Sequence, residues 1–177
     1  MSIRQLTHRE SISNEAGTSL VLVCDNIASP ANAGSIIRLA DAFGIQEIYF
    51  CGSKIDLGSN RLKRTSRSTQ EYVKIIMRDD IHELLNAFKG KGMKLIGLEI
   101  TNTSIALQKL TPIEGKAALI LGNERRGLKP EILSLLDHSI HIDMYGKNSS
   151  MNVGHAAAIA LYELRKNHPI RNIPNDK

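Results

Sequence analysis

Three polar segments of the chain carry residue types that suit ligand binding and chemistry on the bound ligand. They cover residues 25–38, 121–128 and 142–155, and each directly follows an apolar run. Short apolar runs of this kind are typical of buried strands. Because ligands of open α/β sheets bind beyond the carboxyl ends of the strands, we expect the three segments to form one composite site.

The first segment leads from a polar turn into a helix that we expect to begin near Asn32. Asn32 is either the N-cap of this helix or a side chain of the site. Arg38 follows Ile36 and Ile37, so we expect it on an apolar helix face. A guanidinium there costs desolvation energy unless an anion meets it, and Glu124 is the expected partner. The alternative is that the stem of Arg38 packs while its charge stays in solvent.

The second segment contains two glycines, Gly122 and Gly127, on either side of Glu124. Glycines allow the backbone to approach a ligand closely, so we expect any side chain at Gly122 to project toward that ligand. The alternative is an ordinary turn between a strand and a helix, with solvated charges.

The third segment is a glycine-containing loop that precedes the long C-terminal helix. Ser149 or Ser150 is either the N-cap of that helix or a residue of the site. Asn152 then falls in its first turn, where it is either part of the site or solvated.

Several familiar kinds of site are excluded. The sequence has neither the P-loop pattern nor the G-x-G-x-x-G pattern of dinucleotide sites. Cys24 and Cys51 fit no metal or redox spacing and are interpreted as buried thiols, so we expect no metal site. No apolar run is long enough to span a bilayer, and residues 1–10 lack a signal-peptide pattern. We therefore expect a cytoplasmic protein with no membrane partner.

The net charge of +5 is concentrated in one part of the chain. Residues 54–78 contain seven basic and two acidic residues, so the rest of the chain sums to zero. A local basic patch suits an RNA backbone, because each neutralised phosphate releases counterions. The expected RNA-binding residues are Arg61, Lys63, Arg64 and Arg67. The alternative is a solvated basic loop. With no tryptophan and few other aromatic residues, base stacking is not expected to dominate recognition.

Apolar runs alternate with helical patterns along the chain. Strands are expected at 19–25, 47–51, 72–77, 94–99, 117–121 and 139–143, and helices at 32–43, 81–88, 131–136 and 151–166. The strands mostly lack two-residue alternation, as is typical of a sheet covered on both faces. The pattern predicts a single α/β domain over residues 1–177 with a mainly parallel, six-stranded sheet. Its core is about 19–166, with tails at 1–18 and 167–177.

Taken together, the three segments resemble the SpoU, or TrmH, branch of the SPOUT RNA methyltransferases. The resemblance covers about residues 19–166 and depends on three motifs in the right order. The first is Asn32, Gly34 and Arg38; the second is Gly122, Glu124 and Gly127; the third is Ile142, Met144, Ser150, Met151, Asn152 and Val153. Asp143 replaces the usual proline of the third motif, and Met151 replaces a leucine.

The resemblance implies a deep trefoil knot in the C-terminal part of the fold and a homodimer. It also implies transfer of a methyl group from S-adenosylmethionine to a ribose 2′-hydroxyl of RNA, leaving S-adenosylhomocysteine. The cofactor lies in the knot loops of that family. The residues that correspond to cofactor contacts are Glu99, Ile100, Thr101, Leu121, Gly122, Asn123, Gly127, Ile142, Met144, Met151 and Asn152.

The resemblance also implies a catalytic set of Arg38, Glu124, Asn152, Asn32 and Ser150. In it Arg38 acts on the 2′-hydroxyl, and its site receives cofactor loops from the partner chain. Glu124 orients Arg38 or Asn152, while Asn152 and Ser150 hold the ribose or the loop. Arginine stays protonated in proteins, so two roles remain open for Arg38. It is either a perturbed base or a cation that binds phosphate and stabilises the alkoxide.

Three other functions remain as alternatives. The first is an RNA-binding protein of this fold without catalysis, which the presence of Arg38, Glu124 and Asn152 disfavours. The second is methylation of an RNA base, and the third is a small-molecule enzyme that binds another nucleotide. Among RNA substrates, tRNA is preferred over ribosomal RNA by analogy with short members of the family.

Overall fold

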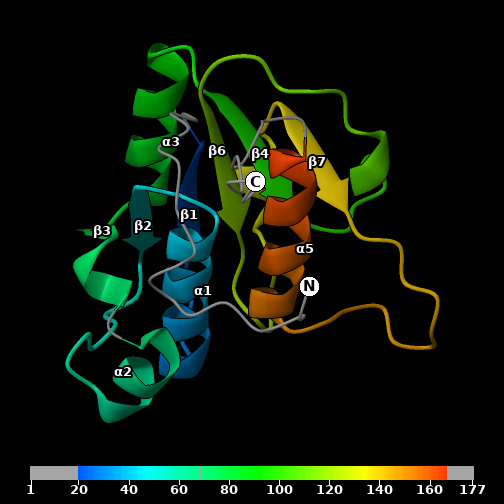
Figure 1. The fold of residues 1–177 in the computed structure, drawn as a ribbon. Helices are drawn as coiled ribbons and strands as arrows, with labels where there is room; N and C mark the ends of the chain where they lie inside the picture. The colour runs from blue at the N-terminus through cyan, green and yellow to red at the C-terminus, as the bar shows by residue number, and fades with distance from the viewer. Residues whose placement is uncertain (1–19, 68, 167–177) are drawn as a thin grey trace, which may run out of the picture.

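The computed structural model describes residues 20–67 and 69–166, whose strands form one sheet (Figure 1). All strand pairs are parallel, and the strand order is β3-β2-β1-β6-β4-β7-β5. The strands are β1 (Leu20–Asp25), β2 (Glu47–Cys51), β3 (Lys74–Arg78), β4 (Lys94–Leu98), β5 (Ile105–Ala106), β6 (Ala117–Leu121) and β7 (His138–His141). The parallel α/β class is confirmed, but the prediction of six strands was wrong, because the sheet has seven among the described residues. The seventh, β5, has two residues, too few to leave a pattern.

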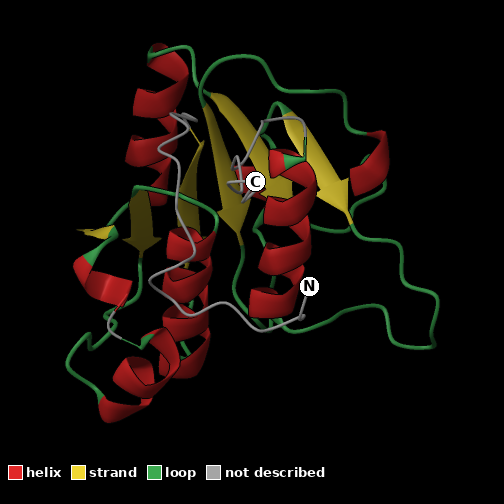
Figure 2. Ribbon diagram, in the orientation of Figure 1, coloured by secondary structure: helices red, strands yellow, loops and turns green. Residues whose placement is uncertain are grey.

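Helices cover both faces of the sheet (Figure 2). On one face lie α1 (Pro30–Ala42) and α5 (Val153–Arg165), and on the other lie α3 (Ile81–Gly90) and α4 (Pro130–Leu133). The helix expected at 131–136 thus begins one residue earlier and ends three residues earlier. A further helix, α2 (Asn60–Ser66), packs on α1, and short 3-10 turns occupy Thr69–Glu71 and Leu107–Lys109.

The alternation of side chains along each strand divides the core into two layers. Leu22 of β1 packs toward α1 with Ile37, whereas its neighbour Val23 packs toward α3 with Leu85. All four side chains are fully buried, and burial of an aliphatic side chain is worth about 1.5–3 kcal/mol. Cys24 and Cys51 lie in different layers, and their assignment as buried free thiols is confirmed.

The starts of α1 and α5 differ from the expected ones. Ser29 caps α1, because its hydroxyl accepts a hydrogen bond from the backbone N–H of Asn32 at 3.4 Å. Asn32 is therefore not the N-cap, and its side chain is free to face the loops. Asn152 caps α5 by accepting from the N–H of Gly154 at 2.9 Å, so neither Ser149 nor Ser150 does.

The basic segment 54–78 contains a helix that the sequence patterns did not indicate. Helix α2 has seven mostly polar residues, so it shows no apolar period. It lies close to α1 at Gly34, where a Cβ atom would stand 2.7 Å from the carbonyl oxygen of Leu62. The glycine of the first motif therefore allows the two helices to touch, and residues 60–66 of the basic segment form a packed helix instead of a solvated loop.

Four further expectations concern the knot, the tails, the membrane and metal ions. The trefoil knot stays a prediction, and the tails at 1–18 and 167–177 lie outside the described residues. Within 20–67 and 69–166, no helix has the length and apolar character needed to cross a membrane. In the same part of the chain, no three His, Cys, Asp or Glu side chains gather in a way that suits a metal ion.

Candidate active site

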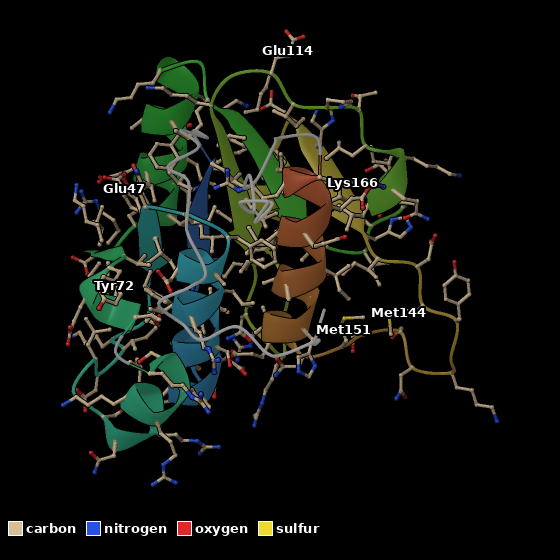
Figure 3. The ribbon with its side chains drawn as sticks, viewed as in Figure 1. Glu47, Tyr72, Glu114, Met144, Met151 and Lys166 are labelled. Atoms are coloured by element: carbon tan, nitrogen blue, oxygen red, sulfur yellow. The ribbon has the colours of Figure 1, made fainter. Side chains whose placement is uncertain are left out.

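Segments that follow the carboxyl ends of β4, β6 and β7 enclose a cavity of about 370 Å³. Its lining includes the apolar side chains of Leu98, Leu121, Ile142 and Val153. Figure 3 shows Met144 and Met151 near the two ends of the loop that joins β7 to α5, and both line the cavity. Figure 1 shows the middle of that loop extending away from the sheet.

Most residues expected to contact the cofactor line this one cavity. The lining includes Glu99, Ile100, Leu121, Gly122, Asn123, Gly127, Ile142, Met144 and Met151. Thr101 and Asn152 do not line it. The backbone N–H of Thr101 donates to Ser104 Oγ at 3.0 Å, so Thr101 is part of a local turn that ends at Ser104. Of the expected catalytic set, Glu124 and Ser150 line the cavity, whereas Asn32 and Arg38 do not.

The carboxylate of Glu99 joins two of the loops. It accepts hydrogen bonds from the N–H of Ile100 at 3.1 Å and from that of Leu128 at 2.8 Å. Gly127 lies beside it with φ +63°, and a Cβ there would stand 2.9 Å from Glu99 Cδ. Gly127 is therefore required both by its backbone conformation and by the closeness of the carboxylate.

Gly122 allows the backbone at Gly127 and Leu128 to pass close to it. A Cβ on Gly122 would stand 2.5 Å from the carbonyl carbon of Gly127 and 2.6 Å from the backbone nitrogen of Leu128. The expectation that a side chain would project toward the ligand was wrong, because the loop crosses directly over this position.

A chain of hydrogen bonds connects all three motifs. Asn32 Nδ2 donates to Glu124 Oε1 at 2.9 Å, and Asn152 Nδ2 donates to Asn32 Oδ1 at 2.9 Å. Asn152 Oδ1 in turn accepts the N–H of Gly154. Each amide uses its oxygen and its nitrogen on different partners, so only one orientation of each satisfies the chain. The motifs are thereby fixed relative to one another at the start of α1 and α5.

Glu124 is held at the N-terminal end of α1. Its carboxylate also accepts from the N–H groups of Ala28 at 3.2 Å and Ser29 at 3.1 Å. Partial burial raises the pKa of this carboxyl, but the hydrogen bonds from Asn32 and the backbone outweigh it and leave the pKa of Glu124 below its ordinary value. Glu124 is therefore an ionised anchor for the loops.

Arg38 does not have the surroundings that the sequence predicted. It is exposed, while Ile36, Ile37 and Ala40 of the same helix are fully buried. The helical period of 3.6 residues turns position 38 away from the sheet, and the apolar neighbours in sequence do not share its face. Among the described residues Arg38 has no hydrogen bond or ion pair, and the expected pairing with Glu124 was wrong because Asn32 and backbone groups take that carboxylate.

Asn123 determines the shape of the loop that follows β6. Its Nδ2 donates to the carbonyl of Asn26 at 2.7 Å, and its Oδ1 accepts the N–H groups of Arg125 at 3.0 Å and Arg126 at 3.1 Å. The N–H of Gly127 returns to the Asn123 carbonyl at 2.9 Å. The loop is therefore closed by its own polar groups.

Seven lining residues were not among the expected cofactor contacts or catalytic residues: Leu98, Arg125, Arg126, His141, Ser149, Val153 and Ala156. The spacing of Val153 and Ala156 on one side of α5 was an available signal, as was the position of the two arginines inside the second motif. His141 lies 2.9 Å from Ser104 Oγ and 3.4 Å from Asp143 Oδ1. Asp143 accepts a hydrogen bond from Gln108 and does not line the cavity.

The expected RNA-binding residues lie together on and after α2. Arg61, Lys63, Arg64 and Arg67 are exposed. Their side chains have no hydrogen bond or ion pair within the described part of the chain. The structure thus leaves four cations available to solvent on one short element.

Comparisons with known proteins give a consistent picture. The model of the SpoU rRNA methylase family matches residues 19–162. The chain is 30% identical to the 23S rRNA (guanosine(2553)-2′-O)-methyltransferase RlmP of Bacillus subtilis, over 82% of this chain and 57% of that protein. It is 26% identical to the tRNA (guanosine(18)-2′-O)-methyltransferase of Aquifex aeolicus, over 92% of this chain and 76% of that one.

A solved structure agrees with these matches. The SpoU methyltransferase AviRb from Streptomyces viridochromogenes, in complex with the cofactor AdoMet, superposes with a TM-score of 0.76 at 25% identity, over 89% of this chain and 62% of that one. The chain thus spans less than two thirds of the Bacillus relative and of AviRb. With three motifs connected by hydrogen bonds beside the cavity and a family model that matches most of its length, the chain belongs to the SpoU methylase family.

Proposed function

We propose that this protein transfers a methyl group from S-adenosylmethionine to a ribose 2′-hydroxyl of RNA. The observation that carries the proposal is the convergence of three loops on one cavity. Nine of the eleven residues that correspond to cofactor contacts in the family line it. The named activities of the Bacillus and Aquifex relatives, both 2′-O-methylations of RNA, support the same reaction.

The cavity suits the cofactor in size and chemistry. Pockets for small molecules hold roughly 300–1,000 Å³, and this one holds about 370 Å³. Its apolar side chains, with Met144 and Met151 among them, suit a flat adenine ring, and the loop backbone offers hydrogen-bonding groups at its edge. When bound, S-adenosylmethionine supplies an electrophilic methyl group on a sulfonium.

The chain's own residues orient the substrate and act on its 2′-hydroxyl. The hydrogen-bonded chain from Glu124 through Asn32 to Asn152 fixes the loops around the cavity, which favours reaction by orientation. Ser150 lies at the cavity and contacts the ribose or its loop. Arg38 acts at the 2′-oxygen in one of two ways. As a base it accepts the hydroxyl proton; as a cation it stabilises the developing alkoxide while the proton passes to solvent water.

The proposal includes a homodimer, because Arg38 does not line the cavity of its own chain. Helix α5 offers a surface for a second copy: Ile159 is 42% exposed and Tyr162 67% exposed, one turn apart. We expect Arg38 of one protomer to serve the cavity of its partner. A test is to mix two inactive variants, Arg38→Ala and Gly127→Val. A shared site predicts partial recovery of activity in mixed dimers, and no recovery would contradict it.

We further propose tRNA as the substrate to test first and the cytoplasm as the place of action. The match with the Aquifex tRNA enzyme extends over more of both chains than the match with the Bacillus rRNA enzyme. The experiment is mass spectrometry of nuclease digests of tRNA and rRNA from a deletion strain. We expect one 2′-O-methylated nucleoside to disappear from tRNA. Loss of a methylated base instead, or no change in either RNA, would contradict the proposed reaction.

A further inference from the structure

Two arginines at the cavity have no role in holding the loops together. Arg125 and Arg126 are the only lysine or arginine side chains among the lining residues, and both are exposed. We infer that they bind an RNA backbone phosphate next to the ribose that is methylated, which makes them substrate-positioning residues. This inference rests on the proposed function and adds to it the group that grips the substrate beside the cofactor.

The two carboxylates at the cavity do not neutralise these arginines. Glu99 accepts from the N–H groups of Ile100 and Leu128, and Glu124 accepts from Asn32 and from backbone N–H groups. In the described part of the chain neither guanidinium has a hydrogen bond or an ion pair. The positive charges at the cavity thus have no internal anion.

The loop that carries the arginines is held in place before any ligand arrives. The backbone N–H groups of Arg125 and Arg126 donate to Asn123 Oδ1, and the N–H of Gly127 donates to the backbone carbonyl of Asn123. Glu124, next in sequence, is tied to the start of α1. The backbone at positions 125 and 126 is therefore fixed, so binding costs only the ordering of two side chains.

The reaction itself brings a phosphate to this position. The 2′-oxygen of a ribose is attached to the carbon next to the one whose oxygen carries the 3′ phosphodiester. A 2′-hydroxyl that enters the cavity therefore brings that phosphate to its mouth. Arginine matches phosphate with parallel N–H donors and is the usual residue for bidentate contact. Helix α2 packs on α1 and contributes no residue to the cavity, so its cations serve other phosphates of the RNA.

The test compares Arg125→Ala/Arg126→Ala with the control Lys91→Ala/Lys116→Ala. The control removes the same charge from exposed lysines that precede β4 and β6, at the opposite edge of the sheet. Filter binding to bulk tRNA from the deletion strain is measured over a range of salt. We expect the arginine variant to bind about tenfold to a hundredfold more weakly. Because one phosphate contact is lost, we expect its salt slope to be shallower by about 1, and the control to match the wild type.

Calorimetry distinguishes this role from two others. In the arginine variant we expect unchanged thermal stability and S-adenosylmethionine affinity within twofold of the wild type. Weakened S-adenosylmethionine binding with unchanged binding of 5′-methylthioadenosine, which lacks the carboxylate, would overturn the inference and assign the arginines to the methionine end of the cofactor. Unchanged RNA affinity and slope would overturn it as well. A wild-type chain that does not bind S-adenosylmethionine contradicts the proposed function instead.

Discussion

The hydrogen-bonded chain around Glu124 and the basic surface of α2 use polar residues in opposite ways. Glu124 has partners from the β1–α1 loop and from Asn32, which in turn binds Asn152. Arg61, Arg64 and Arg67 have no side-chain partner among the described residues. A polar group whose partners lie inside the chain determines geometry, whereas one without internal partners is available to a ligand.

The two regions therefore predict different consequences of mutation. Removing one member of a satisfied hydrogen-bonded group leaves its partners unpaired, at a cost of about 1–3 kcal/mol when they are buried. Removing an exposed cation changes the free energy of unfolding by less than about 1 kcal/mol. Changes around Glu124 are expected to lower stability and cofactor binding together. Changes to Arg61, Arg64 and Arg67 are expected to lower RNA binding alone.

Arg38 gives the largest expected effect and tests whether an unpaired cation marks function. Arg38→Ala removes an exposed side chain with no internal partner among the described residues. The free energy of unfolding is therefore expected to change by less than about 1 kcal/mol, and the S-adenosylmethionine affinity to stay within a few-fold of the wild type. Methyl transfer in single-turnover assays is expected to fall by about 10²-fold or more, the scale of one key electrostatic group.

Arg38→Lys separates the two possible roles of this residue. A cation that binds phosphate is partly replaced by lysine, whereas a bidentate or proton-accepting guanidine is not. Near-normal single-turnover methylation by Arg38→Ala would contradict the mechanism, whatever RNA is the substrate.

The α2 surface gives the next largest effect. Changing Arg61, Arg64 and Arg67 to alanine removes three potential phosphate contacts from exposed positions. The slope of log K for RNA against log salt is expected to fall by about 2 to 3 for duplex-like RNA. Thermal unfolding should not change, because none of the three side chains holds another described residue. An unchanged slope would mean that α2 is a solvated helix and that its exposed, unpaired cations do not mark an RNA-binding surface.

The sequence predicted the sheet and the cavity better than it predicted the basic surface and the surroundings of Arg38. The apolar runs of β1, β2 and β6 predicted a parallel sheet because their side chains are buried on both faces. Motif order predicted that Gly122, Gly127 and Met151 gather at one cavity. Helix α2 was missed because its stability comes from packing at Gly34, a tertiary contact with no local pattern. The predicted surroundings of Arg38 were wrong because residues that are adjacent in sequence do not share one face of a helix.

Gly122 tests the internally satisfied region by crowding. Gly122→Ala places a Cβ 2.5 Å from the carbonyl carbon of Gly127, so the loop that contains Glu124 must move. Overpacking of this kind costs about 1–3 kcal/mol. We expect lower stability by urea unfolding and at least tenfold weaker S-adenosylmethionine binding by calorimetry. Gly90→Ala, where nothing lies within 4 Å of the added atom, is the control. Wild-type affinity in Gly122→Ala would show that the crossing of this loop is not needed for the cavity.

Glu124→Gln gives the smallest effect and tests the ionised state of the anchor. Because hydrogen bonds hold the pKa of Glu124 below its ordinary value, the ionised carboxylate stabilises the folded state. That contribution is fully present above the unfolded pKa of about 4.3 and is lost as pH falls through the lower folded pKa. In urea unfolding at neutral pH we expect Glu124→Gln to be less stable by about 1 kcal/mol, reduced by solvent screening at this exposed position. The difference should shrink below about pH 4. Glu114→Gln changes an exposed carboxyl far from the loops and should show no such dependence (Figure 3). A difference that stays constant between pH 3 and pH 7 would mean that shape, not charge, anchors the loops at Glu124.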